Sequence, residues 1–156
     1  MEDKLQELRS SSIGEEYKQL HKEYLALLQT SANQQEQLEL LKRLVFLNWY
    51  QLVEPSIYTG LYELDEEAVQ AAYSLLDTWL SHDALDQEFS WMLSYYASWD
   101  YAILMYAENC LPALTAFVQE AASAALPLPY HQLPRHSMDN RGSMGRYWQS
   151  VGVEIP

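Results

Sequence analysis

The stretch LELLKRLVFLNWYQLV, residues 38–53, decides the fold that this sequence predicts. Drawn as a helix, it carries apolar side chains on nearly every side. A helix that is apolar all round is normally buried, so we predict a central helix here. Glu54 and Pro55 end it, because the residue before a proline avoids the helical backbone conformation.

Two helix starts lie before this stretch. Ser12 and Glu15 have the spacing of a capping box, and apolar residues then recur at steps of three and four over residues 13–28. Ser31 or Asn33 is the predicted N-cap of the central helix. A second helix is therefore expected immediately before the central one.

Further helices are predicted after a loop at residues 55–64. Asp65 has the position of an N-cap, and an apolar stripe follows over residues 69–80. Pro112 suits the first turn of a last helix, where its missing N–H leaves no hydrogen bond unmade. Small residues on the apolar face over 114–125 permit close approach of another helix.

The composition changes after Leu126. Prolines and glycines argue against regular helix over residues 127–156. We therefore predict an all-α fold: an irregular bundle of about five main helices within residues 1–126, and an extended, Pro/Gly-containing C-terminal tail, residues 127–156, packed on the surface of the same domain. Three arginines of the tail are expected to lie on the acidic body: Arg135, Arg141 and Arg146.

The negative charge is concentrated in one part of the chain. The formal net charge is −13, and residues 44–134 contain 12 acidic residues but no Lys or Arg. Such a field repels nucleic acid and anionic membranes and attracts basic proteins. With 22 acids among 156 residues, the carboxylates are too sparse for a DNA mimic. We predict a basic protein partner, no nucleic acid and no membrane.

Neither a disulfide nor a membrane span is expected. Cys110 is the single cysteine, so it has no internal partner. The first residues lack the basic start and apolar run of a signal peptide, and no segment reaches the ~18 consecutive apolar residues of a membrane span. The sequence predicts a cytoplasmic protein.

Three local clusters suggest chemistry, and each has a simpler structural explanation. His82, Asp83 and Asp86 suit a Zn or transition-metal site, but the same spacing suits a turn between helices with Asp83 or Asp86 as N-cap. Cys110 lies on an apolar stripe without a cation to lower its pKa, which favours a buried structural thiol over a nucleophile. Residues 141–146 contain Gly and Arg but lack the flanking strand and helix of a phosphate-binding loop. We predict no catalytic residue, no metal and no cofactor.

Residues 86–110 contain neither Gly nor Pro and keep helical spacing, as one long helix or as two with a break near Ser98. Large apolar residues also occupy the side opposite the main stripe. Either this helix is covered on both sides, or one face is a partner surface, since Trp and Tyr supply most interface hot spots. The residues predicted to form that surface are Asp77, Asp83, Asp86, Glu88, Trp91, Tyr95 and Asp100.

These observations favour a non-enzymatic acidic protein-binding module, an inhibitor or immunity-type neutraliser of a basic protein partner. In size, charge and aromatic content the chain is similar to small acidic proteins that neutralise basic enzymes, such as immunity proteins of bacterial nuclease toxins, although no residue carries over. An alternative is a structural subunit or homo-oligomeric adaptor that buries an aromatic helix face. A metal-dependent hydrolase at His82, Asp83 and Asp86 is a third hypothesis.

Overall fold

The computed structural model describes residues 14–54, 64–123 and 136–151. Within these ranges the chain is all-α and contains no strand, as the sequence predicts. None of the described helices is both long and apolar enough to cross a membrane. Instead of about five main helices, seven α-helices and one 3-10 turn follow in chain order: α2 (Gly14–Thr30), α3 (Gln34–Val53), α5 (Glu66–Ser81), α6 (Gln87–Tyr96), η1 (Ala97–Trp99), α7 (Tyr101–Ala107), α8 (Pro112–Ser123) and α9 (Gly142–Ser150).

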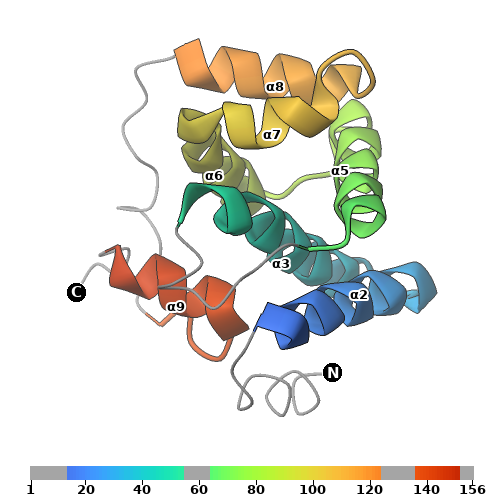
Figure 1. Ribbon diagram of the computed structural model, residues 1–156, viewed down its shortest axis with the longest axis vertical. Coiled ribbons are helices and arrows are strands. Elements are labelled where there is room, and N and C mark those ends of the chain that lie inside the picture. Colours follow the sequence, from blue (N-terminus) through green and yellow to red (C-terminus); the bar gives the residue numbers. More distant parts are fainter. Residues whose placement is uncertain (1–13, 55–63, 124–135, 152–156) are drawn as a thin grey trace.

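Helix α3 runs through the middle of the molecule (Figure 1). Helices α2, α5, α7 and α9 all contact it. Ten consecutive residues of α3, 40–49, are buried, which confirms the predicted central helix. Burial of one large apolar side chain stabilises a fold by roughly 1.5–3 kcal/mol, so this uninterrupted run makes α3 the main contributor to the core.

Side-chain caps fix where several helices begin. The side-chain oxygens of Asn33, Asp65 and Asp86 accept hydrogen bonds from backbone N–H groups in the first turns of α3, α5 and α6. Helix α8 begins at Pro112, where a proline needs no hydrogen-bond donor. These four helix starts are as predicted, because each depends on residues that are adjacent in sequence.

The stretch 86–110 is divided into two helices. Helix α6 ends at Tyr96 and α7 begins at Tyr101, with η1 between them at the break that the sequence placed near Ser98. The sides of α7 that are buried and exposed are therefore not a continuation of those of α6. The outward side of α7 carries the two exposed large apolar side chains of the described residues, Tyr101 and Met105.

The prediction of an extended tail is wrong for residues 142–150, which form α9, so that α8 is not the last helix. The two glycines that argued against a helix here each meet a local requirement, one of backbone conformation and one of space. Gly142 has a φ of +66°, which favours glycine, and a Cβ at Gly145 would overlap the backbone of the preceding turn. Two side chains of α9 lie in the core rather than on the surface: Met144 and Trp148.

Some sequence predictions concern residues outside the described ranges. These are the Ser12 cap, all but Leu64 of the predicted loop at 55–64, and the proline-containing part of the tail through Arg135. They stay predictions.

A polar contact lies inside the core between α2, α3 and α5. Nε2 of His21 lies 2.7 Å from Oδ1 of Asn48, whose Nδ2 donates to the carbonyl oxygen of Val69 at 3.3 Å. The amide therefore presents its oxygen to the imidazole, and Nε2 carries the proton. The other ring nitrogen, Nδ1, is buried and has no hydrogen-bond partner among the described residues. Desolvation lowers the pKa of His21, against the opposing effects of Asn48 and Asp65.

We predict that His21 makes the fold sensitive to mild acid. Its pKa in the folded protein lies below the usual 6.5. The contribution of the neutral imidazole to the free energy of unfolding is therefore complete above pH 6.5 and is lost as the pH falls towards the folded pKa. Uptake of one proton on unfolding limits the slope to about 1.4 kcal/mol per pH unit. Urea unfolding between about pH 7 and about pH 5 should give a steeper loss for the wild type than for His21→Gln. Equal slopes for the two proteins would contradict the assignment.

Candidate functional site

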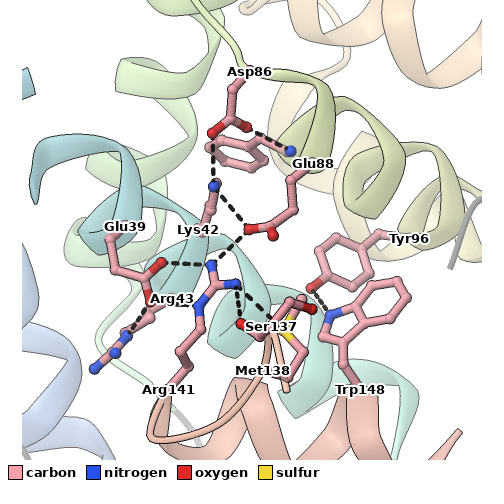
Figure 2. Close-up of polar contacts among 11 residues, drawn as sticks. Glu39, Lys42, Arg43, Asp86, Glu88, Tyr96, Ser137, Met138, Arg141 and Trp148 are labelled. Atoms are coloured by element: carbon pink, nitrogen blue, oxygen red, sulfur yellow. Dashed lines mark hydrogen bonds and ion pairs between the residues drawn. The ribbon is translucent and has the colours of Figure 1, made fainter. Parts of the chain in front are cut away.

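An ion cluster joins three distant parts of the chain (Figure 2). Lys42 of α3 places its Nζ 2.9 Å from carboxylate oxygens of both Asp86 and Glu88 at the start of α6. Arg141, which precedes α9, places its Nη2 2.6 Å from Glu39 of α3 and 2.7 Å from Glu88. We define the ion cluster as these residues together with Arg43, whose Nε donates to Glu39 at 2.8 Å: Glu39, Lys42, Arg43, Asp86, Glu88 and Arg141.

Burial makes this pairing necessary. The side chains of Lys42 and Arg43 are only 7% and 2% exposed, and a buried cation without a partner costs several kcal/mol. Burial by itself raises the pKa of Glu88, but hydrogen bonds and charges from Arg141 and Lys42 outweigh it and hold that pKa below its usual range. Burial by itself lowers the pKa of Arg141, but the hydrogen bonds and charges of Glu88 and Glu39 outweigh this effect, so its pKa is raised above the usual value. Glu88 and Arg141 are therefore both ionised at neutral pH.

Two residues predicted to face a partner belong to the ion cluster. Asp86 caps α6 and pairs with Lys42, while Glu88 bridges Lys42 and Arg141. Their charge is largely met inside the molecule. The expectation that tail arginines lie on the acidic body is confirmed for Arg141, whereas Arg146 is exposed and donates to a hydroxyl of its own helix.

Tyr95 lies in an aromatic cluster between α3, α6 and α9. Its ring centroid is 4.9 Å from that of Trp148, and its hydroxyl lies 2.8 Å from the hydroxyl of Tyr147. Tyr95 is 8% exposed, and Trp91 is half-buried against the core. The side of α6 that the sequence offered as a partner surface is thus partly covered by α9. Of the two alternatives, coverage on both sides describes α6 better.

The other predicted partner residues lie at helix ends. Asp77 accepts a hydrogen bond from the backbone N–H of Leu114 at 3.0 Å and so links α5 to the start of α8. Asp83 is exposed and has a φ of 52°, and Asp100 is exposed immediately before α7. Of the seven predicted residues, only Asp83 and Asp100 are exposed. The structure does not bring all seven onto one outward surface.

Two of the three hypothetical metal ligands have another role, and the third, Asp83, is exposed. Nδ1 of His82 lies 2.9 Å from the carbonyl oxygen of Thr78 at the end of α5, and Asp86 belongs to the ion cluster. In the described part of the chain, no three His, Cys, Asp or Glu side chains are placed to hold a metal ion. The hypothesis of a metal-dependent hydrolase gains no support from this geometry.

The prediction that Cys110 is buried is wrong. Its thiol is exposed and donates to the carbonyl oxygen of Tyr106 at 3.1 Å. The apolar spacing that suggested burial continues to Cys110, but α7 ends at Ala107 and Asn109 has a φ of 72°. The turn takes Cys110 out of the helical register, and therefore off the buried face.

Comparison of the chain with protein-family models, with curated proteins and with solved structures gives no match.

We predict that Arg141→Met lowers the free energy of unfolding by about 3 kcal/mol, because it leaves Glu39 and Glu88 short of a buried cation. Arg146→Met is the matched control: this exposed arginine should change stability by less than about 0.5 kcal/mol. Chemical denaturation with circular dichroism measures both. Equal losses in the two variants would show that Arg141 does not hold α9 to the ion cluster.

We also predict that Cys110 reacts with Ellman's reagent in the native protein. Its exposure should make the native rate comparable, within about tenfold, to the rate in urea. The chain has one cysteine, so Cys110→Ser gives the blank. If Cys110 reacted only after global unfolding, the thiol would have to be buried, contrary to this structure.

Proposed function

We propose that this protein is a non-enzymatic binding module that neutralises or inhibits a basic protein partner. The observation that carries the proposal is a division of its carboxylates into two groups. Those of the ion cluster pair with the buried cations, whereas others point outward with no ion-pair partner among the described residues. The outward group consists of Glu66, Glu67, Asp83, Asp100, Glu108 and Glu120.

The outward group lies within the segment that has no Lys or Arg of its own. Of the described cations, Lys42 and Arg141 are engaged in the ion cluster, and Lys22 lies 3.4 Å from Asp65. Few basic side chains are left to offset the outward charge. Exposed carboxylates that no cation offsets accelerate association with a basic protein and disfavour binding of acidic proteins.

A structural subunit that binds a copy of itself is a second candidate. Exposure of Tyr101 and Met105 favours it, because exposed large apolar side chains often mark interfaces. The charge opposes it, since two copies would each bring a net −13 to the contact. Sedimentation at micromolar concentration distinguishes the candidates: a dimer supports self-association, and a monomer excludes it at that concentration.

We predict salt-sensitive binding to a basic protein. The immobilised protein should retain a strongly basic protein from a lysate of its native host. The dissociation constant of that purified partner should rise at least about tenfold between about 50 and about 300 mM NaCl, since salt screens exposed charges. Replacing the six outward carboxylates by their amides should slow association more than it speeds dissociation.

The control variant carries Gln29→Ala and Gln87→Ala, two exposed and uncharged positions, and should bind as the wild type does. Charge reversal at Asp86 or Glu88 would not serve, because it would disrupt the ion cluster and with it the fold. Binding that is indifferent to salt, or retention of acidic proteins alone, would refute the proposal.

A further inference from the structure

The outward face of α7 combines apolar and acidic side chains. Tyr101 and Met105 are 54% and 63% exposed, while Ala102, Ile103 and other residues of the opposite side are buried. Positions 101 and 105 share one side of α7. Glu108 is the C-cap of α7, and its backbone N–H still donates to the carbonyl oxygen of Leu104, so this residue follows on the same side at the end of the helix. Asp100, also exposed, lies at the other end. We define the α7 face as Tyr101 and Met105 together with the carboxylates that flank them at the two ends of the helix, Asp100 and Glu108.

A helix end adds to the negative potential at this face. The hydroxyl of Tyr101 donates to the carbonyl oxygen of Leu52 at 3.4 Å, which places the ring beside the C-terminal turn of α3. That turn has no basic residue, and Glu54 follows as its C-cap. A helix C-terminus carries a partial negative charge that cations stabilise. The tip of the Tyr101 ring therefore lies next to a helix end whose last turn contains no basic residue of its own.

We propose that the α7 face is the docking site for the basic partner, through a segment that sets an apolar side chain between Lys or Arg residues. This inference rests on the proposed function and specifies its site. Tyr101 and Met105 are of the types enriched in interface cores, and the surrounding carboxylates meet the cations of the incoming segment.

Charge complementarity selects this occupant over a second copy of the chain. A symmetric contact through the α7 face would bring Asp100 and Glu108 of one copy towards the same residues of the other. Like charges placed together at an interface cost several kcal/mol. A cationic segment meets the same carboxylates, and the end of α3, with favourable energy.

A peptide of Leu and Lys at helical spacing is a direct probe, with a Leu and Glu peptide of the same pattern as its counterpart. Titrated into the full-length labelled protein, the Lys peptide should shift the backbone NMR signals of α7 first. Tyr101→Ser combined with Met105→Ser should weaken its binding at least about tenfold, which is the size expected for loss of interface anchors. Both side chains are largely exposed, so the fold should survive, as circular dichroism would verify.

Paired charge variants separate the site from the overall charge. Asp100→Asn with Glu108→Gln and Glu66→Gln with Glu67→Gln each remove two exposed carboxylates, the second pair from the start of α5. The first pair should weaken binding about fivefold at low salt and the second less than about twofold, because screening confines the effect to nearby charges.

The outcomes distinguish this inference from the proposed function. If the Lys peptide binds but all variants bind it equally, attraction to basic partners stands and the α7 face is overturned as its site. Binding no tighter than that of the Leu and Glu peptide would refute both. A dimer that is lost in the Tyr101→Ser, Met105→Ser variant would assign the face to self-association and overturn the inference.

Discussion

Lys42 and Arg43 lie within the longest buried run of the described residues, 40–49, and a cation in such a place is stable only when carboxylates surround it. This requirement positions two later helices, α6 and α9, against α3. It brings the start of α6 to α3 through Asp86 and Glu88, and it brings the segment before α9 there through Arg141. Once Arg141 is in place, Trp148 packs against Tyr95 and Tyr96 and completes the core. The last described helix is thus held by ions as well as by aromatic packing.

The same requirement determines which negative charges a partner would meet. The buried cations come from outside the acidic segment, and they draw in only some of its carboxylates. Those that they do not reach lie at helix ends and on the α7 face. The chain therefore combines a nearly neutral interior with an acidic exterior, and the proposed attraction to a basic protein uses only the exterior part. The net charge alone does not reveal this division.

Local features of the fold were predictable from the sequence, and distant contacts were not. Three helices are capped by side chains that bond to backbone N–H groups two or three positions later, those of Asn33, Asp65 and Asp86. The buried run of α3 could be predicted because the helix is apolar on nearly every side. The pairing of Arg141 with Glu39 spans 102 positions, and no periodicity encodes it. Two adjacent cations within an apolar helix were the available signal that distant carboxylates must converge there. The burial of Cys110 was predicted wrongly because the helical spacing of apolar residues continues to position 110, whereas α7 ends at Ala107.

The pairing of Glu39 with Arg141 also has a consequence for synthesis on the ribosome. Translation proceeds from the N-terminus, so α3 emerges long before the residue that completes its neutralisation. Until Arg141 leaves the exit tunnel, Glu39 and Glu88 lack one of their cations, and Trp148 is not yet available to cover the aromatic rings of α6. The nascent helices can collapse but cannot reach native packing, because this contact closes late and over a long loop. Native packing of α3 and α6 therefore waits until residues 141–148 have left the exit tunnel.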